Sequence, residues 1–451
     1  MSENKKLSPA KFGLLGFQHM FAMFGATVLV PTLTGLSVSA TLLFAGLGTL
    51  LFHLITKGKV PAFLGSSFAF LSGYFAVKSM PQFAGEGALN WIPYAGAGVA
   101  VAGLVYCIVA GLFKVFGAGK VMRFFPPIVT GPIIIAIGLI LSNTAVNNCA
   151  TNWPIALLAL AIVIVFNIWG KGMFKIIPIL LGVIGSYLVA ALTGQVDFSK
   201  VAEAEWIGVP FQMEDTVFSL FAGCDVSLLV TVILTVAPIC LATMMEHIGD
   251  MSAISSTVGK NFIEDPGLHR SLLGDGCATA LAALFGAPAN TTYGENTGVL
   301  ALTKVYNPAV VRMAAILAVL FSFCPKFAAL INCMPAATIG GVSLILYGMI
   351  SAVGVRNIVE NQVDFSKSRN VIIAALIIAL ALGIHFSGAL GCDTIAQNWG
   401  SISFTIGDVK IGLSGLAVAS IVGILLNAIL PGNDYTFGAN KKGDESVNFK
   451  V

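Results

Sequence analysis

Long apolar runs recur along nearly the whole chain, and they restrict its fold more than any other feature. An apolar run of about 17–25 residues can cross a bilayer as a helix. Of all residues, 57% are hydrophobic and 10% are charged, whereas a soluble domain carries roughly 25% charged residues. We therefore predict an all-α polytopic membrane protein. The predicted spans are 13–32, 39–56, 61–77, 92–113, 124–142, 154–170, 174–193, 228–250, 271–287, 289–303, 307–324, 335–354, 370–387 and 411–430.

The basic residues indicate on which side of the membrane each loop lies. With a cytoplasmic N-terminus, the 24 Lys and Arg residues fall on the cytoplasmic side, except for Lys78, Lys200, Lys326 and Lys410. Cytoplasmic loops of membrane proteins carry such an excess of positive charge. We therefore predict fourteen spans in the cytoplasmic membrane, with the N- and C-termini both cytoplasmic.

Fourteen spans divide into two sets of seven, and an odd number in each set gives the halves opposite orientations. Spans five and twelve open alike, with a threonine three residues after Pro127 and after Pro335. Spans three and ten are short and interrupted, at residues 65–67 and 288–292. Matching broken segments in two halves indicate a transporter's binding site. The alternative is that both interruptions are merely helix ends.

Two glutamates, Glu246 and Glu295, lie inside stretches that are otherwise apolar enough to cross a membrane. Each lies in or beside a polar run that disrupts the helical pattern, at residues 245–250 and 290–296. A carboxylate at this depth is costly, so it normally faces a bundle interior or a wet cavity and marks a transport pathway. The alternative is a structural acid that caps a broken helix or pairs with a buried base.

The second interrupted span carries a motif that resembles the signature of the nucleobase–ascorbate transporter family. It reads Glu295-Asn296-Thr297-Gly298, then four residues, then Thr303-Lys304. The likeness extends over nearly the whole chain and is closest to the bacterial uracil permeases of that family. The other segments that resemble these permeases are 18–31, 65–70, 264–270, 291–296 and 340–347.

This resemblance implies a fold of two inverted seven-helix repeats, with short extended segments in broken spans three and ten. It implies a core domain that binds the substrate, made of residues 13–115 and 228–325 (spans 1–4 and 8–11). It also implies a gate domain, made of residues 124–193 and 335–430 (spans 5–7 and 12–14). The implied activity is proton-coupled uptake of uracil as a symporter. The implied partners are uracil, the proton, membrane lipid and a second copy in a homodimer, with no nucleic acid.

The resemblance also implies which residues bind the substrate. Uracil has two N–H donors and two carbonyl acceptors, so a carboxylate can accept from it, and a backbone N–H or protonated carboxyl can donate to it. The two glutamates match the acids that hold uracil, Phe68 and Gly294 match positions that offer backbone groups, and the tyrosines match aromatic neighbours. The full set is Glu246, Glu295, Phe68, Gly294, Tyr293, Tyr347 and Ala26.

Proton coupling is expected from Glu246, Asp250, Asp275 and His19. Glu246 and Asp250 are four residues apart, so they share one helix face, where like charges disfavour double ionisation. The hypothesis is that one proton, shared over Glu246, Asp250 and Glu295, must be present for tight uracil binding. Two alternatives remain open: Asp275 could cap a helix start, and His19 could be a satisfied packing histidine.

Two aspartates depart from the uracil permease pattern. Those permeases often have histidine at the position of Asp250, and purine-transporting relatives have aspartate. Asp275 also resembles the purine branch, whereas Glu295 does not, because purine transporters usually have glutamine there. The remaining motifs favour uracil, and the alternative substrate is xanthine or another purine, also carried with a proton.

Other function classes are less consistent with the sequence. An anion transporter of the same fold would present basic groups or helix dipoles at its site, where this chain has two acids. A channel would show a repeated pore filter. The chain has neither HExxH nor GxSxG, and its eight cysteines are scattered without a CxxC pair. We therefore expect no enzyme activity, no metal site or cofactor, and the proton as coupling ion.

Overall fold

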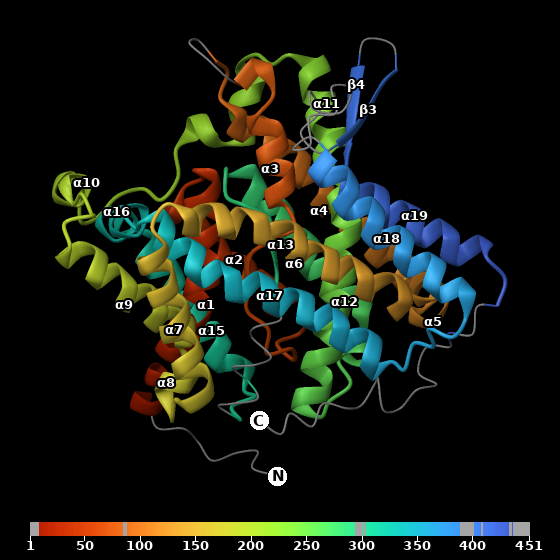
Figure 1. Ribbon diagram of the computed structural model, residues 1–451, viewed down its shortest axis with the longest axis horizontal. Helices are drawn as coiled ribbons and strands as arrows, with labels where there is room; N and C mark the ends of the chain where they lie inside the picture. Colours follow the sequence, from red (N-terminus) through yellow and green to blue (C-terminus); the bar gives the residue numbers. More distant parts are fainter. Residues whose placement is uncertain are drawn as a thin grey trace.

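The computed structural model describes residues 9–83, 88–293, 300, 304–387, 401–406, 409–432 and 435. Helices dominate this part of the chain (Figure 1). The elements up to residue 222 are α1 (Pro9–Thr34), α2 (Val38–Ile55), β1 (Leu64–Ser66), α3 (Leu71–Lys78), η1 (Pro81–Phe83), α4 (Trp91–Phe116), α5 (Ala118–Met122), α6 (Pro127–Ala150), α7 (Trp153–Trp169), α8 (Met173–Ile176), α9 (Pro178–Leu192), α10 (Ser199–Glu203), η2 (Met213–Asp215) and η3 (Val217–Ala222).

The remaining elements contain the segments that carry most of the intramembrane acids. They are α11 (Val226–Val236), η4 (Ala237–Ile239), α12 (Cys240–Val258), η5 (Ile263–Gly267), α13 (Leu268–Leu284), β2 (Asn290–Thr292), α15 (Pro308–Ser322), α16 (Pro325–Asn332), α17 (Ala336–Glu360), α18 (Ser368–Ser387), β3 (Ser401–Ile406), β4 (Val409–Ser414) and α19 (Gly415–Ile429).

Within these described ranges, seven helical segments are long and apolar enough to cross a membrane. One of them runs continuously over α11 and α12, from Val226 to Val258. The pair α15 and α16 would make an eighth span, bent by 89° at its break, and α7, α9 and α19 are shorter apolar helices. A mostly helical membrane protein is therefore confirmed, but it is not all-α, because β3 and β4 form an antiparallel pair and β4 occupies the start of the predicted span 411–430.

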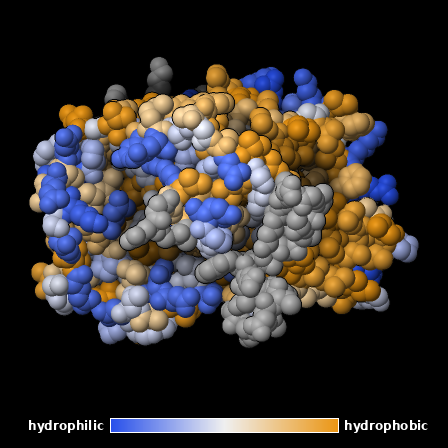
Figure 2. Space-filling model, turned by 90° about the horizontal axis from the view of Figure 1, so that it is seen from above, coloured by the Kyte–Doolittle hydropathy of each residue, from blue (hydrophilic) through white to orange (hydrophobic). Residues whose placement is uncertain are grey.

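One face of α4 illustrates how the protein meets its surroundings. Leu104, Ile108, Leu112 and Val115 are 43–75% exposed and recur every three or four residues, so they form one apolar stripe along the helix. Such a stripe on a helix surface is suited to contact with lipid acyl chains. In Figure 2, hydrophobic residues likewise cover one side of the face that is shown, and hydrophilic residues gather on the other.

The two interrupted segments form a pair of short strands, although 223 residues separate Ser66 from Asn290 in sequence. β1 and β2 pair antiparallel, with Gly65 opposite Thr291 and Ser66 opposite Asn290. Gly65 is required at this place, because a Cβ there would lie 2.5 Å from the ring of Tyr293. The interruptions are therefore extended backbone within the fold and not merely helix ends.

Side chains from neighbouring helices form hydrogen bonds with backbone N–H and C=O groups of this strand pair and of the residue before β2. The Thr49 hydroxyl of α2 accepts from Leu64 N at 2.9 Å and lies 3.3 Å from Leu64 O. Thr279 of α13 donates to Asn290 O at 2.6 Å. Tyr74 of α3 accepts from Ala289 N at 2.8 Å. Non-helical backbone at membrane depth is tolerated only when protein or water pairs its polar groups, and these side chains do so.

The helices pack in two groups, with α12 between them. The strand bundle comprises α1, α2, α4, α13 and α15 around β1 and β2. The α6–α17 bundle comprises α6, α7, α9, α17, α18 and α19. Helix α12 contacts α4 and α13 on one side and α6 and α19 on the other. Its side chains therefore reach the boundary between the two bundles.

Glycines let helix backbones approach closely within each bundle. A Cβ at Gly103 of α4 would lie 2.6 Å from the carbonyl oxygen of Gly276 on α13. A Cβ at Gly354 of α17 would lie 2.7 Å from the carbonyl oxygen of Gly131 on α6. Small residues at crossings are typical of helix packing in membranes.

Candidate functional site

The two acids of α12 lie on one face of that helix. Glu246 is half-buried and Asp250 is 3% exposed. They are four residues apart within Cys240–Val258, which corresponds to about one helical turn. The helix thus carries two carboxyl groups toward the interior of the protein at neighbouring levels.

Asp275 lies in the middle of α13 and is completely buried. Its Oδ1 accepts a hydrogen bond of 3.0 Å from the backbone N–H of Thr292 on β2. The alternative that Asp275 caps the start of a helix is therefore wrong, because α13 begins seven residues earlier at Leu268. Its role in the fold is to hold the end of strand β2 against α13.

Thr292 connects the acids of the two helices. Its Oγ1 lies 3.3 Å from Asp250 Oδ2 and 3.0 Å from His247 Nδ1. The same ring nitrogen lies 3.4 Å from Asp275 Oδ2. The other ring nitrogen, His247 Nε2, lies 3.0 Å from Ser271 Oγ. All of these residues are at most 3% exposed, so α12, α13 and β2 meet in one buried polar network.

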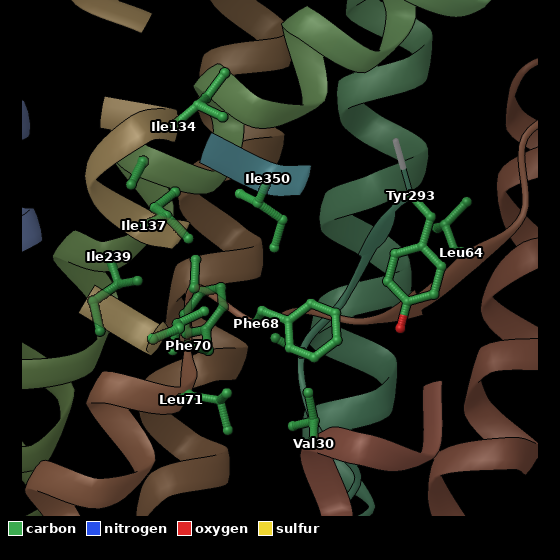
Figure 3. Close-up of a cluster of buried hydrophobic side chains, with 14 of the residues drawn as sticks. Val30, Leu64, Phe68, Phe70, Leu71, Ile134, Ile137, Ile239, Tyr293 and Ile350 are labelled. Atoms are coloured by element: carbon green, nitrogen blue, oxygen red, sulfur yellow. The ribbon is translucent and has the colours of Figure 1, made fainter. Parts of the chain in front are cut away.

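Aromatic rings line the neighbouring wall, in the turn after β1 and at the end of β2. The ring of Phe68 stacks on Tyr293 with a centroid distance of 6.5 Å and an interplanar angle of 16°. It also meets Tyr347 of α17 edge to face at 5.5 Å. Figure 3 shows Phe68 between Tyr293 on one side and Ile134 and Ile137 of α6 on the other. This wall therefore joins the strand bundle to the α6–α17 bundle.

Some buried polar atoms have no hydrogen-bond partner among the residues that the structure describes. They include both ring nitrogens of His19 on α1. Because His19 is only 1% exposed, it is not a packing histidine satisfied by the described part of the chain. A buried polar group without a partner is costly, so these atoms are candidates for contact with a polar solute.

Three predicted substrate-binding positions cannot be located in full. Gly294 and Glu295 lie outside the described residues, immediately after Tyr293. Ala26 lies on α1, but its side chain is outside the described part. Glu246, Phe68, Tyr293 and Tyr347 are described, and the last three form the aromatic wall.

A pocket lies along α12 between the two bundles. On α12 it begins at Ile248 and Gly249, just after Glu246, and reaches Ser252. Thr130 of α6 and Asn357 of α17 line it from the α6–α17 bundle. Asn357 Nδ2 donates to Thr130 Oγ1 at 2.8 Å. The other lining residues are Met122, Phe125, Pro127, Ile263, Leu268, Asn361 and Tyr435.

Reasoning from sequence missed His247, Thr292 and Ser271. His247 follows Glu246 directly, so it points to a different face of α12. That face turns out to meet β2 and α13. A histidine and two hydroxyls inside apolar spans were the available signal, but the contacts join residues up to 45 positions apart, which no local pattern indicates.

Comparisons with known proteins agree with this architecture. The sequence profile of a permease family matches residues 10–390. The chain is 44% identical to the uracil permease of Bacillus caldolyticus, over 93% of this chain and 91% of the relative. It is 41% identical to the uracil permease of Bacillus subtilis over 94% of each chain. For the uracil permease of Escherichia coli the identity is 38%, over 92% and 90%.

Two solved structures share the fold at low sequence identity. The transmembrane domain of a cyanobacterial bicarbonate transporter has a TM-score of 0.54 and 14% identity, covering 94% of this chain and 98% of that chain. A murine anion transporter, solute carrier 26 family member A9, has a TM-score of 0.57 and 10% identity, covering 94% and 69%. At such identities the likeness concerns the fold alone.

Proposed function

Because the chain belongs to the nucleobase–ascorbate transporter family of permeases, we propose that it carries uracil across the cytoplasmic membrane by proton-coupled secondary transport. The observation that carries this proposal is the match to relatives named uracil permeases over at least nine-tenths of each chain. The buried acids beside broken backbone support it, since intramembrane carboxyl groups mark transport pathways.

Substrate recognition is assigned to Glu246, Glu295 and the aromatic wall. Uracil is flat and polar at its edge, so it needs both a stacking surface and hydrogen-bond partners. Phe68 and Tyr293 are parallel within 16°, and this supports a flat ring as the ligand. The half-buried Glu246 would accept from an N–H of uracil, and the backbone of Phe68 and Gly294 would donate to its carbonyl groups.

The transport cycle is assigned to movement of the core domain, residues 13–115 and 228–325, against the gate domain, residues 124–193 and 335–430. The packing of the strand bundle and of the α6–α17 bundle supports this division. The pocket at Gly249 and Ser252, between the bundles, would be the path by which uracil leaves Glu246. We further propose fourteen spans in two inverted repeats, both termini in the cytoplasm, and a homodimer.

Proton coupling is assigned to Glu246, Asp250, Asp275 and His19, and no cofactor takes part. Two carboxyl groups one turn apart on α12 disfavour double ionisation, which supports a shared proton. The buried position of Asp275 and the unpartnered ring nitrogens of His19 among the described residues support their assignment to the same function.

The test is uptake of radiolabelled uracil into proteoliposomes with an imposed inward proton gradient, with unlabelled xanthine as competitor. The expected result is gradient-dependent accumulation that uracil blocks and xanthine does not. Asp250→Asn should abolish the dependence on the gradient, because the amide cannot carry the proton. Block by xanthine would assign the chain to purine transport, and unchanged accumulation in Asp250→Asn would refute the role of Asp250.

A further inference from the structure

Two residues without any assigned role link the two buried aspartates. The sequence of atoms is Asp250 Oδ2, Thr292 Oγ1, His247 Nδ1 and Asp275 Oδ2, with successive distances of 3.3, 3.0 and 3.4 Å. We propose that Thr292 and His247 form a proton relay between Asp250 and Asp275. This inference rests on the proposed proton-coupled transport and extends it by naming the route of the proton.

The surroundings of His247 determine whether one of its ring nitrogens carries a hydrogen. Ser271 Oγ donates to Leu268 O at 3.1 Å, so its lone pairs face His247 Nε2 at 3.0 Å. Because a hydroxyl has a single hydrogen, Nε2 must carry its own hydrogen and donate it to Ser271. The nitrogen whose protonation can change is therefore Nδ1, which is the one that faces Thr292 and Asp275.

The Thr292 hydroxyl also has a single hydrogen, and this gives the network two arrangements. When it donates to Asp250 Oδ2, the Thr292 lone pairs face His247 Nδ1, which must then carry a hydrogen of its own. When it donates to His247 Nδ1, its lone pairs face Asp250 Oδ2, which must then carry one. The arrangements differ in the position of one proton, on the ring or on Asp250.

The transfer between these arrangements is balanced. Asp250 Oδ2 releases its proton to Thr292 Oγ1, Thr292 releases its original hydrogen to His247 Nδ1, and the hydroxyl is restored. The resulting imidazolium lies 3.4 Å from Asp275 Oδ2, which has no other hydrogen-bond partner within the described ranges. Asp275 thus stabilises the charged ring or accepts the proton from it.

The surroundings favour transfer inside the protein over exchange with water. The relay residues are at most 3% exposed, and the ring of Phe52 covers His247 edge to face at 6.4 Å. Among the described residues, Glu246 on α12 and Tyr106 on α4 both interact electrostatically with Asp275, and Cys240 lies near Tyr106. The Tyr106 hydroxyl donates to Thr243 at 2.6 Å.

The relay also reaches the aromatic wall through the backbone. Thr292 donates its own N–H to Asp275 Oδ1 at 3.0 Å, and the next residue, Tyr293, stacks on Phe68. A change in the proton's position alters the hydrogen bonds at the end of β2, immediately before this ring. Protonation and the substrate wall are therefore joined by one residue.

The experiment separates transport that moves protons from transport that does not. His247→Gln keeps a hydrogen-bonding side chain but cannot carry the proton, and Thr292→Val keeps the shape without the hydroxyl. In proteoliposomes, both should lower gradient-driven uracil accumulation at least tenfold and flatten its dependence on pH. Exchange of labelled for unlabelled uracil without a gradient should stay within about twofold of wild type. His269→Gln, at a half-buried histidine outside the relay, should behave as wild type.

The outcomes are distinct. Wild-type accumulation with a wild-type pH profile in His247→Gln would overturn the relay, as would equal loss of exchange and accumulation in folded protein. If His247→Gln does not fold, Thr292→Val decides by the same criteria. Absence of uracil exchange in the wild-type protein would instead refute the proposed function.

Discussion

The strand bundle and the α6–α17 bundle are both packed through glycines, but among the described residues their polar side chains bind different groups. In the strand bundle, Thr49, Thr279 and Tyr74 bind the backbone of β1 and β2. In the α6–α17 bundle, polar side chains instead join one helix to another: Ser186 Oγ donates to Thr338 Oγ1 at 3.2 Å, and Arg369 of α18 donates to Asn427 Oδ1 of α19 at 2.7 Å.

This difference follows from the backbone. The long helices α6 and α17 satisfy most of their own N–H and C=O groups, so their side chains are free to be apolar. A strand of three residues leaves polar groups on its outer edge, and at membrane depth other side chains must pair them. The same broken backbone provides polar groups for a solute, so the region that needs polar support is also the candidate site.

The largest expected effect breaks that support. Thr49→Val removes the hydroxyl that serves both Leu64 N and Leu64 O. Each buried group left unpaired costs about 1–3 kcal/mol, so the free energy of unfolding should fall by about 2–6 kcal/mol. Thr338→Val is the matched control in the α6–α17 bundle, and its cost should stay below about 1 kcal/mol. The control is mild because Ser186 Oγ still donates to Gly182 O at 2.7 Å.

Unfolding of purified protein in mixed detergent micelles would measure both variants. Equal losses for Thr49→Val and Thr338→Val would show that the two bundles do not differ in their need for buried hydrogen bonds.

A second prediction concerns the boundary between the bundles. Gly249→Val adds a side chain at the pocket, where a Cβ would meet only Ile134 Cδ1 at 3.7 Å. The protein should fold, but uracil uptake should fall roughly tenfold, equivalent to about 1.4 kcal/mol, while uracil binding in detergent persists. Gly348→Val on α17, where a Cβ would meet nothing within 4 Å, should transport as wild type. Wild-type uptake by Gly249→Val would exclude this pocket from the path.

A third prediction concerns the aromatic wall. Phe68→Leu removes the stack on Tyr293, and an aromatic pair contributes about 0.5–1.5 kcal/mol beyond area burial. Uracil binding, measured by calorimetry, should weaken roughly two- to tenfold. Phe166→Leu removes the ring pair that Phe166 of α7 forms with Phe174 of α8 at 5.7 Å. These two rings are not part of the aromatic wall, so uracil binding should be unchanged. Equal effects of the two variants would argue against a stacked ligand.

The smallest effect is expected at Tyr347. Its buried hydroxyl lies beside Ser343, one turn earlier on α17, so Tyr347→Phe removes one polar contact and keeps the ring. Thermal stability should change by the equivalent of at most about 1 kcal/mol. Uracil binding should remain within twofold. A large loss of binding would instead indicate that the hydroxyl contacts the substrate directly.

The sequence was informative wherever the physics is local. Apolar runs predicted the membrane helices, and the spacing of Glu246 and Asp250 placed both on one face of α12. Glycine, serine and proline marked the two interruptions that became β1 and β2. Span boundaries were less accurate: residues 61–77 contain a strand and the eight-residue helix α3, because a short apolar run does not distinguish a strand from a helix.

The sequence by itself determined the class of protein, the presence of acids inside membrane-spanning segments, and the family. Hydropathy, spacing and motifs are properties of neighbouring residues. Only the tertiary structure brought His247, Thr292 and Asp275 together and paired β1 with β2. Those contacts depend on how α12, α13 and the strands pack. Burial of polar backbone in an apolar medium then selects the side chains that can satisfy it.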